Sequence, residues 1–131
     1  MRVIVCGGRD YGDHKAVETV LGALHPETTL VHGDCKTGLD RLADSLWRHL
    51  TGRPCERHPA DWYRHDERCY HAPRPDGRCP AAGPRRNREM GDAGASLLVA
   101  FPGGRGTADM RTVAWERGVP ILDVTCRPAG L

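Results

Sequence analysis

The stretch VAFPGGRGT at residues 99–107 places a short apolar run directly before a proline, three glycines and a threonine. A helical pattern follows it, and we expect Thr107 to be the N-cap residue of that helix. Glycines let the backbone turn sharply and approach a ligand closely. A helix that begins at such a loop directs free N–H groups and the positive end of its dipole toward the ligand. The stretch therefore predicts a phosphate-binding loop between a strand and a helix. A tight turn without a ligand is the alternative.

The pattern of strand, loop and helix recurs along the chain of 131 residues. We expect strands at residues 2–6, 28–32, 54–58, 96–101 and 120–124. We expect helices at residues 15–24, 39–50, 85–94 and 107–117, with Gly94 as the C-cap of the third. This alternation implies a mostly parallel sheet with helices on both faces. We therefore predict one α/β domain over residues 1–131 with a doubly wound, Rossmann-like sheet, followed by a loose tail at 125–131.

Glycine-bearing loops follow three of the expected strands, after Cys6, His32 and Phe101. Ligands of open parallel sheets bind outside the carboxyl ends of the strands. In the first loop Arg9 can hold a phosphate through two hydrogen bonds, and Asp10 can accept from ribose hydroxyls. A surface loop with a local salt bridge is the alternative for this pair. The candidate ligand-binding residues are Gly7, Gly8, Arg9, Asp10, Gly33, Asn87, Pro102, Gly103, Gly104, Gly106 and Thr107.

The formal charge of +2 is nearly neutral, but its distribution is uneven. Residues 53–88 hold nine arginines and five acidic residues, whereas the rest holds ten basic and twelve acidic residues. This basic stretch leaves open a nucleic-acid-binding module as an alternative function. No apolar run approaches the roughly 20 residues that a membrane span needs, and the N-terminus does not resemble a signal peptide. We therefore expect a cytoplasmic protein with reduced cysteines.

A proline-rich insertion at about residues 63–83 interrupts the alternation and contains four candidate metal ligands, His65, Cys69, His71 and Cys79. Thiolate and imidazole groups at such short spacings are typical of tetrahedral zinc. A short segment with few apolar residues gains order from a bound metal. We therefore predict a structural zinc ion. Cys55 and His58 are substitutes for the fourth ligand, and a disordered basic loop is the alternative.

Four separated motifs resemble one known family. They are CGGRDY at 6–11, HGD at 32–34 followed by GLDRLA at 38–43, ADW at 60–62, and GPRRNREM at 83–90 leading to the glycine loop. In this order they resemble the YspA-type, cpYpsA-related branch of the SLOG superfamily, which includes the "lonely guy" phosphoribohydrolases and the DNA-processing protein DprA. The resemblance implies a Rossmann-like domain that binds nucleotides or nucleotide-derived ligands and assembles into a homo-oligomer. Trp47 and Trp115 are candidates for a subunit contact or for the core.

The resemblance to the phosphoribohydrolases is partial. Those enzymes cleave the N-glycosidic bond of nucleoside 5′-monophosphates with an Arg-Lys-x-x-Met stretch and a Pro-Gly-Gly-x-Gly-Thr-x-x-Glu loop. Arg86 matches the arginine, since Met90 follows four residues later, and residues 102–107 match the loop. The final glutamate is replaced by Met110, and Asp109 precedes it. One residue along a helix is a turn of about 100°, so a carboxylate at 109 faces a different direction.

We therefore predict nucleotide or nucleotide-derived ligand binding, with the phosphate held by the glycine-rich loop. A phosphoribohydrolase is the first alternative, with Arg86, Asp109 and Asp40 as candidate catalytic residues. A carboxylate such as Asp40 can stabilise an oxocarbenium-like ribose or activate water. The alternative for Asp40 is an acid at a helix N-terminus that is favoured by the helix dipole.

Overall fold

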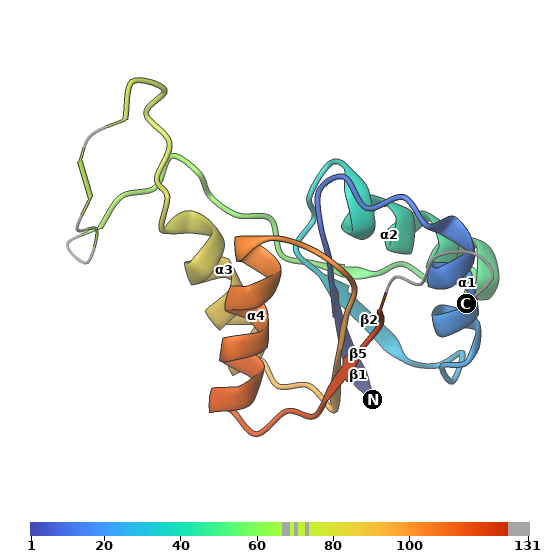
Figure 1. The fold of residues 1–131 in the computed structure, drawn as a ribbon. Coiled ribbons are helices and arrows are strands. Elements are labelled where there is room, and N and C mark those ends of the chain that lie inside the picture. Colours follow the sequence, from blue (N-terminus) through green and yellow to red (C-terminus); the bar gives the residue numbers. More distant parts are fainter. Residues whose placement is uncertain (67–68, 70, 73, 126–131) are drawn as a thin grey trace.

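The protein is described by a computed structural model that covers residues 1–66, 69, 71–72 and 74–125 (Figure 1). The strands in this part of the chain are β1 (Arg2–Cys6), β2 (Thr29–His32), β3 (Glu56–Arg57), β4 (Leu97–Ala100) and β5 (Ile121–Asp123). The helices are α1 (His14–Gly22), α2 (Gly38–Thr51), α3 (Ala82–Asp92) and α4 (Arg105–Glu116). All strand pairs are parallel, which confirms the predicted α/β, Rossmann-like fold class.

The strand order β3-β2-β1-β4-β5 decides where a ligand can bind. The chain proceeds outward from β1 through β2 to β3, and then returns to β4 on the other side of β1. Val5 pairs with Val99 and Cys6 with Ala100, so these central strands end at the same level. The loops after β1 and β4 therefore leave the sheet at the point where the strand order reverses, which is where open α/β sheets bind their ligands.

Helices cover both faces of the sheet. Helices α1 and α2 lie on one face and α3 and α4 on the other (Figure 1). The larger apolar cluster joins α1 and α2 to the sheet and includes Trp47, which is therefore a core residue. A second cluster joins α3 and α4 to the other face and includes Met90 and Met110. Burial of apolar side chains on both faces explains why the central strands are continuous apolar runs.

Several element boundaries differ from the predicted ones. Helix α4 begins at Arg105 with Gly104 as its N-cap, so the expectation that Thr107 is the N-cap was wrong. Thr107 lies in the first turn, where it is buried instead of facing solvent as a capping residue usually does. Helix α3 begins at Ala82, earlier than predicted, and its C-cap is Ala93; Gly94 follows with a φ of 89°. The strand expected at residues 54–58 is shortened to β3.

Within the described residues, none of the helices combines the length and apolar character that a membrane span requires. The cysteines described by the structure are free thiols, namely Cys6, Cys35, Cys55, Cys69 and Cys79. Cys126 and most of the predicted tail lie outside the described residues.

A buried carboxylate fixes the end of β2 to α2 and β3. Asp44 is 6% exposed and lies 2.7 Å from His32 Nε2. Arg57 donates two hydrogen bonds to it, at 2.9 and 3.0 Å, and Arg48 pairs with it at 2.9 Å. His32 Nδ1 accepts from Asp34 N–H, so the ring donates its Nε2–H to Asp44. The Arg57 hydrogen bonds hold the pKa of Asp44 well below its usual range. These contacts join His32, the last residue of β2, to α2 and β3.

Candidate functional site

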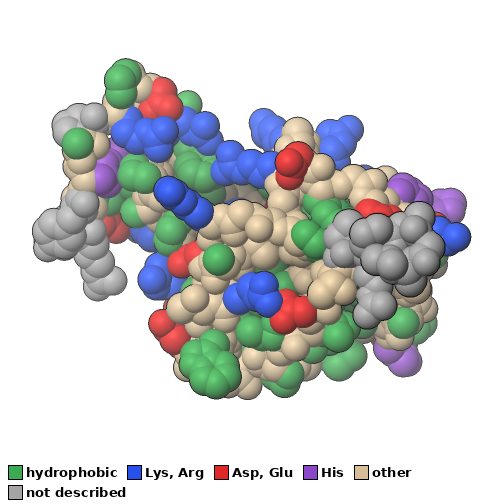
Figure 2. Space-filling model, in the orientation of Figure 1, with side chains coloured by type: hydrophobic (Ala, Val, Ile, Leu, Met, Phe, Trp, Pro, Cys, Tyr) green, Lys and Arg blue, Asp and Glu red, His purple; other side chains and the backbone are tan. Residues whose placement is uncertain are grey.

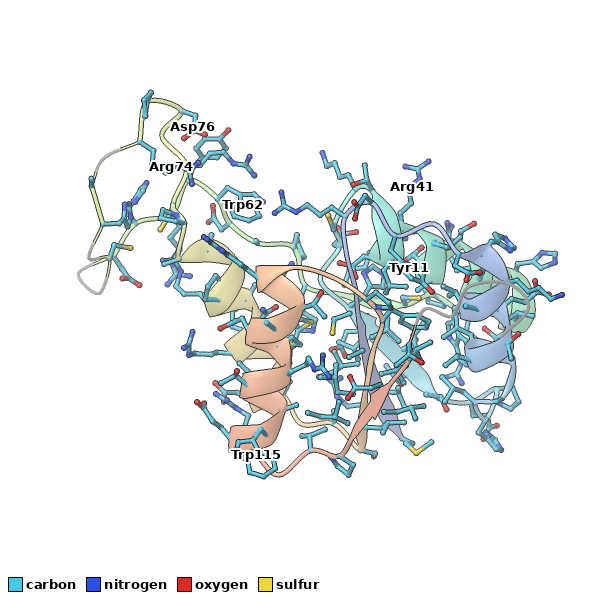
Figure 3. The ribbon with its side chains drawn as sticks, viewed as in Figure 1. Tyr11, Arg41, Trp62, Arg74, Asp76 and Trp115 are labelled. Atoms are coloured by element: carbon cyan, nitrogen blue, oxygen red, sulfur yellow. The ribbon has the colours of Figure 1, made fainter. Side chains whose placement is uncertain are left out.

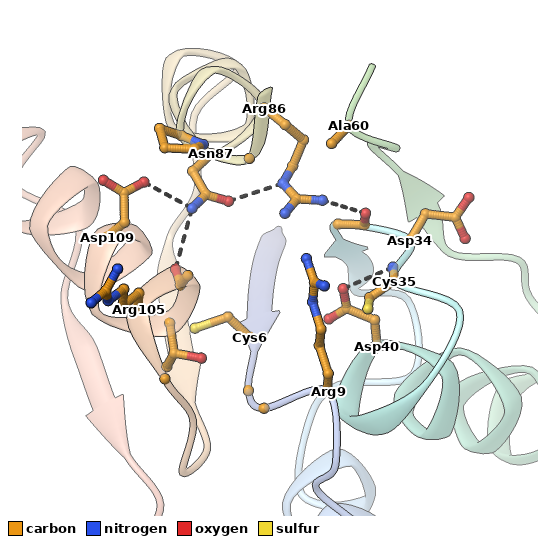
Figure 4. Close-up of a pocket in the computed structure, with 18 of the residues that line it drawn as sticks. Cys6, Arg9, Asp34, Cys35, Asp40, Ala60, Arg86, Asn87, Arg105 and Asp109 are labelled. Atoms are coloured by element: carbon orange, nitrogen blue, oxygen red, sulfur yellow. Dashed lines mark hydrogen bonds between the residues drawn. The ribbon is translucent and has the colours of Figure 1, made fainter. Parts of the chain in front are cut away.

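A pocket with a volume of about 1320 Å³ opens at the carboxyl ends of the strands (Figure 4). The loops after β1, β2 and β4 line it, together with the start of α3. It brings together most of the residues predicted from the sequence: Gly7, Gly8, Arg9, Asp10, Gly33, Asp40, Arg86, Asn87, Gly104, Gly106, Thr107 and Asp109. These residues come from four separate parts of the chain, so the fold assembles one site from all of the glycine-bearing motifs.

Three helices begin at this pocket without a side-chain cap. The N-cap residues Thr37 of α2, Ala81 of α3 and Gly104 of α4 make no side-chain hydrogen bond to the helix that follows. Helix α1 differs, because Asp13 accepts from Ala16 N–H at 3.1 Å. Residues in the first turn of each of α2, α3 and α4 line the pocket. The dipoles of all three helices therefore favour an anion there. The N–H groups at the start of α4 are available to it, whereas Leu39 N–H of α2 donates to the carbonyl of Gly8 and Ala82 N–H of α3 donates to that of Cys79.

Arg86 is held in a fixed position at the wall of the pocket. Its Nη1 donates to the carbonyl of Gly33, and its Nε donates to Asn87 Oδ1 at 3.0 Å (Figure 4). The guanidinium lies so close to Gly33 that a Cβ atom there would be 2.3 Å from Arg86 Nη1. Burial lowers the pKa of Arg86, and the nearby carboxylate of Asp40 raises it. The absence of a side chain at Gly33 is what allows the arginine to occupy this place.

Asn87 links α3 to α4 beside Arg86. Its Nδ2 donates to Asp109 Oδ2 at 2.9 Å and to the carbonyl of Gly106 at 3.3 Å. Asp109 is thus oriented by an amide at the rim of the pocket. Met110, at the position of the glutamate in the phosphoribohydrolases, is 1% exposed and belongs to the core. The fold therefore uses this position for packing.

Two other groups that line the pocket, Asp40 and Cys6, have raised pKa values. Burial raises the pKa of Asp40, while a hydrogen bond from Cys35 N–H and the charge of Arg86 oppose the shift. Burial also raises the pKa of the Cys6 thiol to about 12. Cys6 therefore stays protonated at neutral pH, and it lacks the thiolate character of a nucleophile.

Pro102 and Gly103 are not among the described residues that line the pocket. They join the loops after β4 and β1, because Gly8 N–H donates to the carbonyl of Pro102 at 2.9 Å. A Cβ atom on Gly103 would lie 2.1 Å from Thr107 Oγ1 and 2.7 Å from Gly8 N. Tyr11 also closes the first loop, since its ring packs against Phe101 at 5.4 Å between centroids. These residues shape the site without facing it.

The pocket residues that were not predicted as site residues include Lys36, Trp62, Arg78 and Arg105. Lys36 and Arg105 lie within two of the glycine-bearing loops, and Trp62 lies within the ADW motif, so a local signal existed for these three. Arg78 lies in the insertion, and nothing in the sequence indicates that it reaches the pocket. The pocket is thus lined by five basic side chains, namely Arg9, Lys36, Arg78, Arg86 and Arg105. In Figure 2, basic side chains gather along this upper edge of the molecule.

The four predicted metal ligands lie together in the insertion. One donor atom from each of His65, Cys69, His71 and Cys79 lies within 4.8 Å of all the others. The sulfur atoms are 3.5 Å apart, and Cys79 Sγ is 3.5 Å from His71 Nε2. A disulfide requires a sulfur separation near 2.05 Å, so these thiols are not bonded to each other. We call these four residues the metal-binding group, after the ion that such a cluster could hold.

The surroundings of the metal-binding group suit ligands of a metal. His71 Nδ1 contacts the carbonyl of Ala72 at 2.9 Å, and His65 Nε2 contacts that of Gly77 at 3.0 Å. Each ring thus has one nitrogen free for a metal. Arg85 Nη1 lies 3.4 Å from both sulfur atoms and places a positive charge beside them. Arg85 therefore contacts the metal-binding group, whereas Arg86 lines the pocket.

The two substitutes for the fourth ligand lie elsewhere. Cys55 approaches His32 and Asp44, which form another group that a metal can occupy. The Asp44 carboxylate is already bound by His32 and two arginines, so this group is better described as an ion-pair cluster. His58 Nε2 lies 2.6 Å from Glu56 Oε2.

Comparisons with known proteins agree with this architecture. The family model described as "YspA, cpYpsA-related SLOG family" matches residues 1–65, which include the loops after β1 and β2. The Gene 61 protein of Mycobacterium phage D29 is 30% identical, and the alignment covers 97% of this chain and 98% of that protein. No solved structure matches the chain. The chain therefore belongs to the YspA, cpYpsA-related SLOG family.

Proposed function

We propose that the protein binds a nucleotide or a phosphoribosyl-type ligand in the pocket at the strand ends. The observation that carries this proposal is the convergence of three helix N-termini without a side-chain cap on one pocket that also holds five basic side chains. Phosphate in proteins binds arginines and the free N–H groups of a helix N-terminus, which α4 supplies here. Family membership supports a nucleotide-related ligand of a Rossmann-like domain.

The phosphate is best placed at the start of α4. A Cβ atom on Gly104 or Gly106 would meet nothing within 4 Å, so open space lies beside this backbone. Arg9 and Arg86 line the same pocket and supply positive charge. Asp10 and Asp40 remain as acceptors for ribose hydroxyls. The glycines thus leave room for an anion to approach the main-chain N–H groups.

Isothermal titration calorimetry tests this proposal. The purified protein is titrated with ribose 5-phosphate and with AMP, GMP, CMP and UMP. We expect saturable binding of ribose 5-phosphate and of at least one nucleotide, with an affinity that falls as salt is raised. Flat titrations with all five compounds would contradict the proposal.

Hydrolysis of the N-glycosidic bond is the second candidate activity. It is favoured by Asp109, which lies in the pocket and is oriented by Asn87, and by Asp40, whose pKa is raised. Against it stands Met110, which is buried where the hydrolases carry a glutamate. Chromatography of each nucleotide after incubation with the protein separates the two functions, because only a hydrolase releases the free base.

The basic stretch gives less support to a nucleic-acid-binding module. Arg57 binds Asp44, Arg85 donates to the sulfurs of Cys69 and Cys79, and Arg86 donates to Gly33. These arginines make contacts within the protein, so they do not form a free basic surface for a polyanion.

The metal-binding group is proposed to hold one structural zinc ion. Two thiolates and two imidazoles form a donor set that zinc prefers in structural sites. In a tetrahedral site with Zn–S bonds near 2.3 Å, two sulfurs lie about 3.8 Å apart. The observed 3.5 Å is close to this separation. A metal here stabilises a segment that has few apolar residues of its own.

Mass spectrometry under native conditions measures the zinc content directly. We expect one zinc per chain in the wild-type protein and none in Cys79→Ser, because a serine hydroxyl is a poor zinc ligand. Cys35→Ser serves as the control, since Cys35 lies outside the metal-binding group and should keep the ion. Equal zinc content in all three proteins would contradict this site.

The same spectra report the number of subunits, and we propose a homo-oligomer. Trp115 on α4 is 80% exposed, which is unusual for so large an apolar side chain. Its surface is therefore the candidate subunit contact.

A further inference from the structure

Trp62 stands at the wall of the pocket where the insertion meets the body of the protein (Figure 3). Its ring is approached by two planar cations. Arg9, from the loop after β1, lies 5.4 Å from the ring centroid, and Arg78, from the insertion, lies 4.4 Å from it. The ring is half-buried, so it retains a surface that faces the pocket. Flat groups from two different parts of the chain already pack on this ring.

We propose that Trp62 is the surface on which the base of the bound nucleotide stacks. The inference rests on the proposed function, because it names the part of the ligand that this side of the pocket receives. With the phosphate at the start of α4, a planar group is needed for the other end of the ligand, and Trp62 is an aromatic residue that lines the pocket. Aromatic rings bind bases through their π-faces with little preference for one base.

Movement of the Arg9 side chain can expose the face of the Trp62 ring to the base. Arg9 is exposed and belongs to a loop, so a base that enters over Trp62 can displace its guanidinium from the ring. The displaced guanidinium stays beside the phosphate-binding loop, since Arg9 and Gly104 line the same pocket. Arg9 then exchanges a cation–π contact for a charge-assisted hydrogen bond to the ligand, which is the stronger interaction in a partly exposed site.

The insertion holds Trp62 in this place. Cys79 N–H donates to the carbonyl of Trp62, and Cys79 is a fully buried member of the metal-binding group. On its other side the ring leans on α3, where a Cβ atom on Gly83 would lie 3.7 Å from Trp62 Cη2. The hydrogen bond from the backbone of Cys79 thus helps to position the Trp62 ring at the wall of the pocket.

Calorimetry with two kinds of ligand tests the proposal on the 131-residue protein purified in the presence of zinc. The ligands are the four nucleoside 5′-monophosphates and ribose 5-phosphate, which has no base. Trp62→Ala should weaken the binding of every nucleotide that the wild type binds by about 5- to 150-fold. The binding of ribose 5-phosphate should change by less than about twofold. Trp62→Phe should retain most of the nucleotide affinity, because it keeps an aromatic face.

Tyr63→Ala is the matched control, because Tyr63 is the neighbouring aromatic residue, is 69% exposed and does not line the pocket. It should bind all ligands as the wild type does. If Trp62→Ala weakened ribose 5-phosphate as much as the nucleotides, Trp62 would only support the shape of the pocket and the stacking role would be wrong. Unchanged nucleotide affinity in Trp62→Ala would overturn it as well. A wild-type protein that binds neither kind of ligand would refute the proposed function itself.

Discussion

Asp44→Asn is expected to lower the free energy of unfolding by about 3 kcal/mol at pH 7. The substitution leaves the shape of the side chain unchanged but removes a charge that pairs with Arg48 and Arg57. It also replaces one carboxylate oxygen with an NH₂ group, which would face the donors that surround the carboxylate. His32 is 1% exposed, so water cannot replace Asp44 as the hydrogen-bond partner of its ring. Urea unfolding followed by circular dichroism measures the difference.

Asp123→Asn provides the control for this experiment. Asp123 pairs with Arg111, but both side chains are nearly half exposed. An exposed pair of this kind contributes about 0–1 kcal/mol, because water competes for both charges. A loss of stability as large as that of Asp44→Asn would show that burial is not the cause.

The effect of Asp44→Asn should also depend on pH. The pKa of Asp44 is lower in the folded protein than in the unfolded chain, where it is about 3.9. Its contribution to stability is therefore fully present above about pH 5 and is lost as the pH falls through and below the unfolded value. The difference between wild type and Asp44→Asn should shrink when unfolding is measured at pH 3.5 instead of pH 7. A constant difference over this range would mean that the carboxylate has no depressed pKa.

Gly106→Val is expected to lower the affinity for ribose 5-phosphate and nucleotides roughly 100-fold, which corresponds to about 2.7 kcal/mol. The first turn of α4 is the proposed phosphate site, and a valine side chain would fill the open space beside it. The phosphate would then lose charge-assisted hydrogen bonds to the main chain. The fold should tolerate the change, because a Cβ atom at this position meets nothing within 4 Å.

Gly22→Val is the matched control, since Gly22 is also a helical glycine with open space around it but lies on α1, which begins away from the pocket. Calorimetry and thermal unfolding are measured on both variants. We expect melting temperatures close to that of the wild type for both, and weak binding for Gly106→Val alone. Full affinity in a folded Gly106→Val protein would place the phosphate elsewhere.

The sequence determined the fold because the signals for it are local. Apolar runs before glycines at Cys6, His32 and Phe101 mark three strands that end at one edge of a parallel sheet. Since parallel strands bring their carboxyl ends together, the amino-acid pattern alone is enough to assign these loops to one site. The boundaries were less certain, because Thr107 has the chemistry of an N-cap but is buried in the first turn of α4.

Only the tertiary structure separated the residues that face the ligand from those that support them. Arg85 and Arg86 are adjacent in the sequence, yet one contacts the sulfurs of Cys69 and Cys79 and the other contacts Gly33. Adjacent helical residues point about 100° apart, so the rotation of α3 decides their roles. Similarly, the spacing of His65, Cys69, His71 and Cys79 suggested a metal, but only the fold of the insertion brings their donor atoms within 4.8 Å. Local pattern thus determines which elements form, whereas contacts between distant segments decide what each side chain does.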